Sequence, residues 1–266
     1  MKREIFNLPS FLKAKSTGHP ISMVTCYDST FAKLVEKSSI DCILVGDSVA
    51  MTMHGHSDTL KATPEMMATH VEAVRRGAPT KFIVADLPFL AHRGSLDETM
   101  KAVRLIMSAG ANAVKIEGID GSEQTFHHIV ESGVPVMGHL GLTPQSVNVF
   151  GGFRVQGKTL SAAEAIKKQA IKLESTGVFA IVLECVPSTL ANEITKASKV
   201  PTIGIGAGNG CDGQVLVIQD LLGLNTDFRP KFVRQFGILS ASVEAALKDF
   251  DLATKDRSFP NGGESF

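Results

Sequence analysis

The stretch NAVKIEG, residues 112–118, has the apolar composition of a covered strand and yet carries two charges. Gly118 closes the apolar run, as glycine commonly does at a strand end. Lys115 and Glu117 stand two residues apart, so in a strand both side chains point to the same face. The stretch therefore predicts a strand that presents a lysine and a glutamate side by side at one place.

Similar apolar runs recur along the whole chain, and each ends in glycine, proline or a polar residue. Together they make eight candidate strands, at 21–28, 42–48, 82–88, 113–118, 134–141, 180–187, 201–208 and 214–220. Near-continuous apolar runs are typical of parallel strands that helices cover on the outside. The sequence therefore predicts a parallel sheet.

Helical patterns fill most of the gaps between these runs. Ser95 with Glu98, and Ser161 with Glu164, have the spacing of a capping box at a helix start. Thr63 followed by a proline has the pattern of a cap and a first helical residue. Strand and helix thus alternate over the length of the chain.

This alternation predicts one α/β domain, since no linker-like break interrupts it. Eight strands favour a closed (β/α)8 TIM barrel over an open doubly wound sheet, and 266 residues is a usual length for one. Only five residues separate the last two strands, so a crossover helix does not fit there. The predicted domain spans 1–266, with a short N-terminal extension and a loose C-terminal tail at 253–266.

Charge and cysteine content argue against several other classes of protein. Lysine plus arginine equals aspartate plus glutamate, at 27 each, so no net charge favours nucleic acid or acidic lipid as a partner. No apolar run reaches the roughly 18–20 residues of a membrane span, and the N-terminal residues lack a secretory signal. The four cysteines show no C-x-x-C spacing. We therefore expect a cytoplasmic protein without nucleic-acid or membrane partners.

Polar residues gather where the predicted strands end, which is where a (β/α)8 barrel builds its active site. These residues are Asp47, Ser48, Asp86, Lys115, Glu117, His139 and Glu184. Strand alternation places Asp47 with Val45 and Glu184 with Val182. Any one of them alone is a common strand-end or cap residue, but the set on five strands favours a site.

The four carboxylates of this set need a compensating cation. Two like charges about 4 Å apart repel by ~4 kcal/mol at an effective dielectric near 20. Lys115 supplies one positive charge, which leaves carboxylate in excess. Oxygen ligands without a cysteine or histidine cluster favour Mg²⁺ or a similar hard ion over zinc. The sequence therefore predicts a magnesium site at the carboxyl ends of the strands.

The glycine-rich segment GIGAGNG, 204–210, is a poor fit to a dinucleotide-binding fingerprint. No long helix with apolar periodicity follows it within a βαβ unit. A tight turn at the barrel mouth is the better interpretation.

The motifs as a set resemble the ketopantoate hydroxymethyltransferase family. They are LVGDS (44–48), ADLPF (85–89), VKIEG (114–118), GHLGLTPQSVN (138–148), GGFRVQG (151–157), LECVP (183–187) and IGIGAG (203–208). They are collinear and cover roughly residues 20 to 235. The long pair GHLGLTPQSVN and GGFRVQG is the most specific part of the resemblance.

The resemblance implies a barrel of the phosphoenolpyruvate/pyruvate type that works in pantothenate and coenzyme A synthesis. Such an enzyme transfers a hydroxymethyl group from 5,10-methylenetetrahydrofolate to 3-methyl-2-oxobutanoate through a Mg²⁺-stabilised enolate, giving 2-dehydropantoate. It also implies one Mg²⁺ per subunit and a homo-oligomer, with a decamer common in the family.

The matched motifs also imply roles for single residues. Asp47 and Asp86 would bind Mg²⁺, with Glu117 near it through water. Ser48 and Lys115 would hold the substrate carboxylate, and His139 would contact the incoming hydroxymethyl oxygen. Glu184 would be the base that removes the C3 proton, a task for which a carboxylate near a Lewis-acidic metal is suited.

Two alternatives stay open at this point. One is another magnesium enzyme of α-keto acids, such as a phosphonopyruvate or oxaloacetate lyase of the related barrels, which would not require tetrahydrofolate. The other is a non-catalytic barrel that binds a metabolite or serves as a scaffold, which would bind ligand without turnover.

Overall fold

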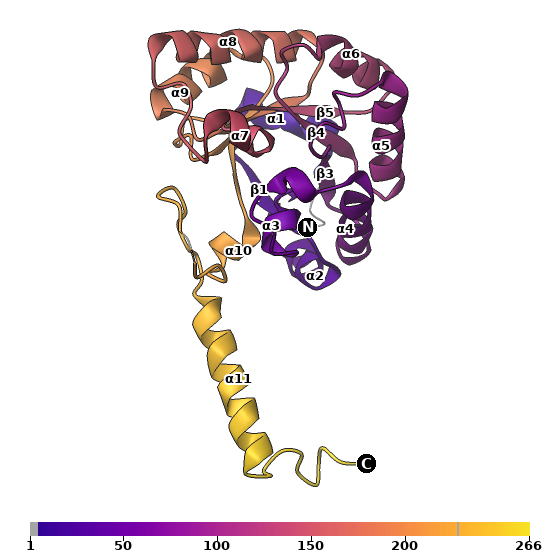
Figure 1. The fold of residues 1–266 in the computed structure, drawn as a ribbon, viewed down its shortest axis with the longest axis vertical. Coiled ribbons are helices and arrows are strands. Elements are labelled where there is room, and N and C mark those ends of the chain that lie inside the picture. The colour runs from indigo at the N-terminus through magenta and orange to yellow at the C-terminus, as the bar shows by residue number, and fades with distance from the viewer. Residues whose placement is uncertain (1–4, 228) are drawn as a thin grey trace. The chain divides into compact units, whose positions relative to one another are not determined.

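The computed structural model describes residues 5–227 and 229–266, and within them eight parallel strands form a closed barrel in sequential order (Figure 1). The strands are β1 Ile21–Thr25, β2 Cys42–Val45, β3 Phe82–Asp86, β4 Ala113–Glu117, β5 Val136–Gly141, β6 Ala180–Glu184, β7 Thr202–Ile205 and β8 Gly213–Leu216. Each predicted strand is present, and β8 closes the ring by pairing with β1. The predicted (β/α)8 barrel is confirmed.

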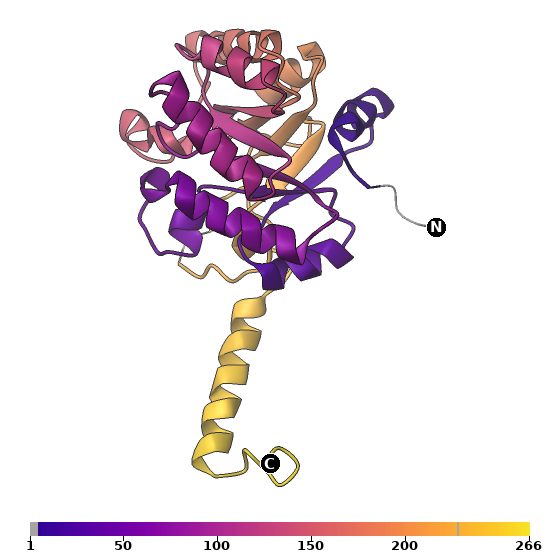
Figure 2. The ribbon, with the colours of Figure 1, turned by 90° about the vertical axis from the view of Figure 1, so that its right-hand side faces the viewer.

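Helices surround the strands on the outside, as Figures 1 and 2 show. The helices of the described residues are, in chain order, α1 Leu8–Thr17, α2 Ser29–Lys37, α3 Val49–Thr52, α4 Pro64–Gly77, α5 Leu96–Ser108, α6 Glu123–Glu131, α7 Val147–Phe150, α8 Leu160–Ser175, α9 Ser188–Ala197, α10 Ile218–Leu221 and α11 Leu239–Lys255, with short 3₁₀ turns η1 Thr59–Lys61 and η2 Pro144–Ser146. None of the described helices is long and apolar enough to cross a membrane.

The caps at the helix starts were predicted with mixed success. Thr63 caps α4 with Pro64 in its first turn, and Ser95 with Glu98 forms the predicted capping box of α5. The predicted box of Ser161 and Glu164 is wrong, because α8 begins earlier and its N-cap is Thr159. Thr159 and Ser161 are both hydroxyl residues near the start of this helix. The spacing to Glu164 alone points to Ser161 as the cap, whereas the structure uses Thr159.

The connection between β7 and β8 is short and contains no helix in the described segment 206–212. Gly206 and Gly208 have φ values of +63° and +80°, a conformation that glycine adopts without steric penalty. Only two residue pairs register between these strands, against five between β5 and β6. The glycine-rich segment is therefore a turn, and the last βα unit is degenerate as predicted.

The amino end of the barrel is filled by aromatic rings. Phe11 of α1, the indigo helix beside the amino terminus in Figure 2, is fully buried. Its ring centroid lies 5.4 Å from that of Phe82 and 4.9 Å from that of Phe179, at the starts of β3 and β6. These side chains belong to the same core cluster as the inward residues of the strands. Helix α1 therefore closes this end, a role that the sequence did not reveal.

The chain divides into two compact units, one ending at Leu216 and one at Val217–Phe266. The second unit contains α10 and α11. Helix α11 takes in the first three residues of the segment expected as a loose tail, and 256–266 contain neither helix nor strand. The first four residues of the expected N-terminal extension lie outside the described residues.

Candidate active site

The residues expected at the strand ends lie together at the carboxyl end of the barrel. Asp86 ends β3, Lys115 and Glu117 lie on β4, His139 lies on β5, and Glu184 ends β6. Asp47 and Ser48 follow β2 and lead into α3. Except for Ser48, which is half-buried, and Glu184, whose side chain is 17% exposed, these residues are buried. Glu184 is thus the carboxylate that solvent and substrate reach most easily.

Lys115 is the central cation of the site. Its Nζ lies 3.0 Å from Asp86 Oδ1 and 3.9 Å from Glu117 Oε1. Burial by itself lowers the pKa of Lys115, but the surrounding carboxylates, Asp86 foremost, outweigh burial and hold that pKa above its ordinary value. The pair of charges in NAVKIEG therefore belongs to a wider network, and its lysine is held protonated.

His139 connects this lysine to Glu184. Lys115 Nζ lies 3.1 Å from His139 Nδ1, and an ammonium can only donate, so Nδ1 accepts. Burial, followed by the charge of Lys115, lowers the pKa of His139, so the ring is neutral and carries its proton on Nε2. That atom lies 3.3 Å from Glu184 Oε2. The site therefore holds an N–H donor and a carboxylate side by side at its exposed edge.

The backbone after Glu184 is held in an unusual conformation. Cys185 has φ +46°, which a non-glycine side chain rarely adopts and which costs of order 1–3 kcal/mol. Its N–H donates to Ile205 O at 2.9 Å, and its carbonyl accepts from Gln156 N at 2.8 Å. These bonds fix the chain at the residue next to Glu184 and so fix the direction of that carboxylate.

The predicted alternation of Asp47 with Val45 is wrong, although Asp47 does lie in the site. Strand β2 ends at Val45, and its inward residues in the core cluster are Cys42 and Leu44. The alternation of side chains between the two faces of a strand does not continue into the turn that follows β2. Asp47 is instead placed by its own backbone N–H, which donates to Asp86 Oδ2 at 2.9 Å.

Gln145, which the sequence did not single out, holds three parts of the site together. Its Nε2 donates to Asp47 Oδ2 at 2.7 Å and to Leu87 O at 3.0 Å. Its backbone N–H donates to Glu117 Oε2 at 3.0 Å. The residue lies inside the motif GHLGLTPQSVN and in the short turn η2, but a neutral amide carries no charge or periodicity that predicts such a role.

Tyr27 is a second residue that the sequence did not single out. Its side chain is buried, and its hydroxyl lies 2.8 Å from Ser48 Oγ. Burial raises the pKa of Tyr27 to about 12, so the phenol stays protonated. Ser48 therefore has a fixed neutral partner on β1's side of the site.

Two carboxylates of the site, Asp47 and Glu117, have raised pKa values. Burial raises the pKa of Asp47 well above its usual range, and the charges of Asp86 and Glu117 raise it further. Burial likewise raises the pKa of Glu117 to about 7, against the opposing charge of Lys115. One lysine does not compensate this cluster, which is the imbalance that the sequence predicts.

The donor set fits a hard divalent cation. Apart from their contacts with Lys115 and, for Glu117, with the ring of His139, Asp86 Oδ1 and Glu117 Oε1 are buried without a hydrogen bond. Within residues 5–227 and 229–266, however, no group of three His, Cys, Asp or Glu side chains converges on a metal position. The arrangement therefore suits an ion that takes one or two carboxylates and completes its shell with water and substrate oxygens, as Mg²⁺ does.

A family model described as Ketopantoate hydroxymethyltransferase matches residues 6–262. The chain belongs to the ketopantoate hydroxymethyltransferase family. The resemblance seen in the motifs is therefore confirmed, and the family match extends well beyond the motifs toward both ends of the chain.

Relatives in this family are similar over nearly their whole length. A 3-methyl-2-oxobutanoate hydroxymethyltransferase of Coxiella burnetii is 53% identical over 256 residues, covering 96% of this chain and 96% of the relative. One of Bdellovibrio bacteriovorus is 53% identical, covering 96% and 97%. One of Francisella tularensis is 51% identical over 250 residues, covering 94% of both chains.

Solved structures with a similar fold include more distant barrels. Phosphonopyruvate hydrolase in complex with oxalate and Mg⁺⁺ has a TM-score of 0.63 at 12% identity, covering 97% of this chain and 92% of that one. A 2,3-dimethylmalate lyase, described as a PEP mutase/isocitrate lyase superfamily member, has a TM-score of 0.60 at 14% identity, covering 97% and 91%. This likeness concerns the fold, and it agrees with the predicted phosphoenolpyruvate/pyruvate type of barrel.

Proposed function

We propose that this chain transfers a hydroxymethyl group from 5,10-methylenetetrahydrofolate to 3-methyl-2-oxobutanoate, forming 2-dehydropantoate for pantothenate synthesis. Family membership over residues 6–262 supports the reaction. The observation that carries the assignment to this site is that the residues of the matched motifs meet at one end of the barrel, around Lys115.

Glu184 is the base that takes the C3 proton of the keto acid. Its carboxylate is the most exposed of the site, and the constrained backbone at Cys185 fixes its direction. Water cleaves the two C–N bonds that hold the methylene carbon to the folate, which releases tetrahydrofolate and leaves that carbon as a formaldehyde unit. The deprotonated C3 carbon adds to this unit, a C–C bond forms, and the carbonyl oxygen takes up a proton to become the hydroxyl of the hydroxymethyl group. The neutral ring of His139 presents its Nε2–H beside Glu184, where it donates to the oxygen of the new hydroxymethyl group.

Ser48 and Lys115 hold the carboxylate of the keto acid. Lys115 is suited to this because it stays protonated among its carboxylate neighbours. The same property argues against a covalent role, since an imine-forming lysine needs a lowered pKa. Tyr27 orients Ser48 through the contact between the two hydroxyls.

Asp47 and Asp86 would hold Mg²⁺, and Glu117 would lie near the ion through water. Glu117 is engaged by Gln145 N at one oxygen and faces His139 Nδ1, 3.3 Å away, with the other. When bound, the ion acts as a Lewis acid toward the keto group, which makes the C3 proton easier to remove.

The chain also assembles with copies of itself. None of the residues of α11 is buried, although Val243, Leu247 and Phe250 follow one another at helical spacing and are 48%, 64% and 58% exposed. A helix with an apolar stripe needs a partner surface. Light scattering would measure the mass of the assembly and would show whether it is the decamer that is common in the family. Leu247→Lys should lower this mass.

We also propose a cytoplasmic location, which fits the four free cysteines at 26, 42, 185 and 211.

The test is an assay of 2-dehydropantoate formation with and without Mg²⁺ and with and without methylenetetrahydrofolate. Product formation that requires both supports the proposal. Cleavage of a C–C or C–P bond in an α-keto acid without folate would favour a lyase. Binding of the keto acid without any turnover would favour a non-catalytic barrel.

A further inference from the structure

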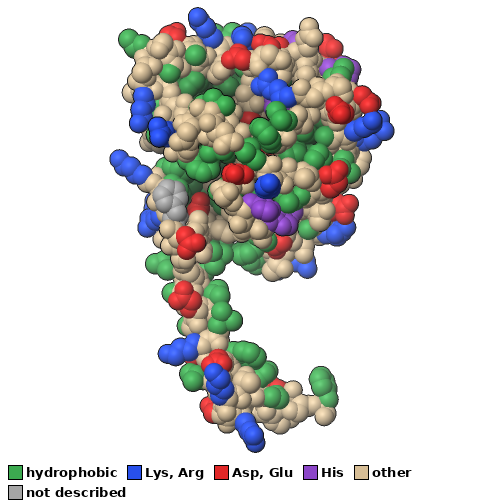
Figure 3. All heavy atoms as spheres, viewed as in Figure 1, with side chains coloured by type: hydrophobic (Ala, Val, Ile, Leu, Met, Phe, Trp, Pro, Cys, Tyr) green, Lys and Arg blue, Asp and Glu red, His purple; other side chains and the backbone are tan. Residues whose placement is uncertain are grey.

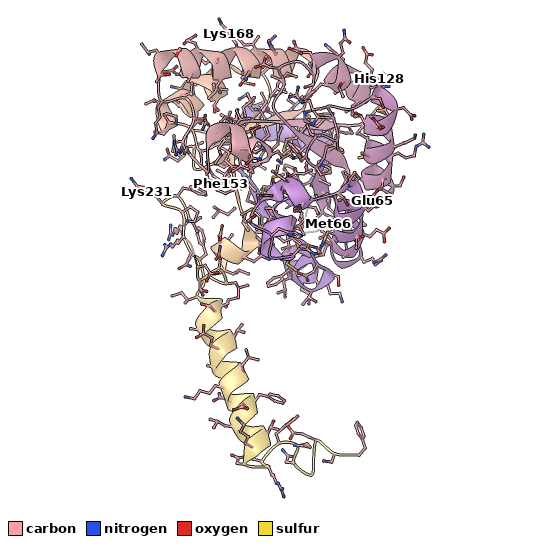
Figure 4. The ribbon with its side chains drawn as sticks, in the orientation of Figure 1. Glu65, Met66, His128, Phe153, Lys168 and Lys231 are labelled. Atoms are coloured by element: carbon pink, nitrogen blue, oxygen red, sulfur yellow. The ribbon has the colours of Figure 1, made fainter. Side chains whose placement is uncertain are left out.

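A cluster of histidines lies on the surface over α3, separate from the candidate active site (Figure 3). His54 and His56 belong to the segment between α3 and η1, and His70 belongs to α4, whose first turn Glu65 and Met66 mark in Figure 4. His54 and His56 are exposed, and His70 is half-buried. The proposed reaction uses none of them.

The ring of His70 is oriented by the backbone of Tyr27. Its Nδ1 lies 2.6 Å from Tyr27 O, and a carbonyl oxygen only accepts, so Nδ1 carries the proton. In the neutral ring Nε2 then has a free lone pair, which faces His54 Nε2 at 2.9 Å. Metal-binding histidines usually have such a second hydrogen bond, because it fixes the tautomer and the ring.

We propose that His54 and His70 together bind one late transition-metal ion, Cu²⁺ or Ni²⁺, through their Nε2 atoms. In the metal-free pair His54 Nε2–H donates to His70 Nε2. On binding, this proton moves to His54 Nδ1, so both rings stay neutral. Two metal–nitrogen bonds form, and two water molecules leave the ion.

The separation of the two nitrogens selects the class of metal. With metal–nitrogen bonds of about 2.0–2.1 Å, two nitrogens 2.9 Å apart subtend an angle of about 90° at the ion. A right angle suits the tetragonal geometry of Cu²⁺ and Ni²⁺. A tetrahedral zinc site needs a wider separation, of about 3.3 Å.

His56 is a neighbour of the site and not a third ligand. Its ring is stacked on that of His54, with centroids 6.4 Å apart and planes at 14°. Stacked rings direct their nitrogens alongside one another and not at a common point. This agrees with the absence, among the described residues, of a three-residue metal group. Water completes the shell of the ion.

The test uses the untagged full-length chain, stripped with a chelator and then given excess Mg²⁺ to occupy carboxylate sites. Cu²⁺ is titrated by calorimetry, and electron paramagnetic resonance counts the coupled imidazole nitrogens. We expect one Cu²⁺ per chain with two coupled nitrogens. His54→Asn should lower the affinity by at least about 10-fold and leave one coupled nitrogen. The side chain is exposed, so this variant should fold.

Two controls separate this pair from other histidines. His56→Asn should leave affinity and nitrogen count unchanged. The variant His127→Asn/His128→Asn removes two exposed histidines of α6, one of them labelled in Figure 4, which point apart because they are adjacent in a helix. It should also change nothing. Unchanged binding in His54→Asn, or Zn²⁺ bound as tightly as Cu²⁺, would overturn the proposal.

Discussion

The two ends of the barrel are built from the same strands and hold opposite kinds of side chain. At the amino end the ring of Phe11 packs against Phe82 and Phe179, and all three are buried. At the carboxyl end Lys115 lies among buried carboxylates, two of which, Asp47 and Glu117, have raised pKa values. Apolar burial stabilises the first end, whereas burial of like charges destabilises the second. The comparison teaches that this fold separates its stability from its chemistry along the barrel axis.

The largest effect should come from removing the proposed base at the carboxyl end. Glu184→Gln keeps the shape of the side chain, so exchange of the C3 hydrogen of 3-methyl-2-oxobutanoate with D₂O, measured by NMR with Mg²⁺ and without folate, should fall by about 10²–10⁴-fold. The free energy of unfolding should change little, since this carboxylate is partly exposed.

Glu193→Gln is the matched control, because its side chain is 58% exposed on α9 and pairs only with Lys167 among the ion pairs of the described residues. This variant should catalyse exchange of the C3 hydrogen of the keto acid at the rate of the original chain. Exchange at the full rate in Glu184→Gln would move the base elsewhere, and Glu117 and His139 would be tested next.

The opposite result is expected at the amino end. Phe11→Ala removes a fully buried ring, so the free energy of unfolding should fall by about 3–5 kcal/mol, measured by urea denaturation. The exchange rate per folded molecule should stay near normal, because the ring lies at the other end of the strands.

Leu12→Ala is the control, since Leu12 is the next residue of α1 and is 52% exposed. Its stability should change by about 0.5 kcal/mol or less. Equal losses in the two variants would mean that α1 contributes by its helix and not by its plugging ring.

The pH dependence of stability should reveal two opposed groups near the carboxyl end. Glu117 has its pKa raised from 4.5 to about 7, so its stabilising contribution is complete below pH 4.5 and is lost as the pH rises through 7. His92 is buried without a hydrogen bond, and burial lowers its pKa from 6.5 to about 4. Its contribution is complete above pH 6.5 and is lost as the pH falls through 4. Each effect is up to about 3 kcal/mol.

The two contributions to the free energy of unfolding change in opposite directions with pH, so they nearly cancel in the original chain. Variants that remove one group at a time should separate them. With a chelator present, His92→Gln should lose stability as the pH rises from 4.5 to 7, and Glu117→Gln should gain it from 4 to 6.5. Denaturant titrations at stepped pH measure both. Identical pH profiles in the two variants would contradict the assignment.

The smallest effect concerns a residue that is near the carboxyl end but outside the chemistry. Ser95→Ala removes the cap of α5 and should lower stability by about 1 kcal/mol, with exchange of the C3 hydrogen unchanged. Ser161→Ala is the matched control, because Ser161 lies inside α8 and does not cap it. In thermal melts, Ser95→Ala should have a lower Tm than Ser161→Ala. A lower Tm in Ser161→Ala would contradict the observed caps.

The sequence predicted most of the barrel because the signals of its strands are local. The eight apolar runs, the degenerate last unit and the strand-end polar residues can all be read from neighbours along the chain. Even Lys115 and Glu117 were placed correctly by period two alone.

The missed features depend on contacts between distant segments. Gln145 reaches Asp47 across 98 positions of the chain, and Phe11 reaches rings at the starts of two strands. Asp47 was assigned to the wrong alternation because β2 ends two residues before it. Local patterns state where an element runs, but they do not state which side chains meet once the ring has closed.

The short pairing between β7 and β8 is the place where we expect the barrel to open most easily. Two residue pairs register there, the described connection at 206–212 contains no helix of its own, and two of its glycines have positive φ. Segments with few contacts have the lowest free energy of local opening. In native-state amide hydrogen exchange, the β7–β8 ladder should therefore lose protection before the β5–β6 ladder. The barrel would then open first between β7 and β8, next to the strand β6 that carries Glu184, while the rings of Phe11, Phe82 and Phe179 remain packed at the amino end.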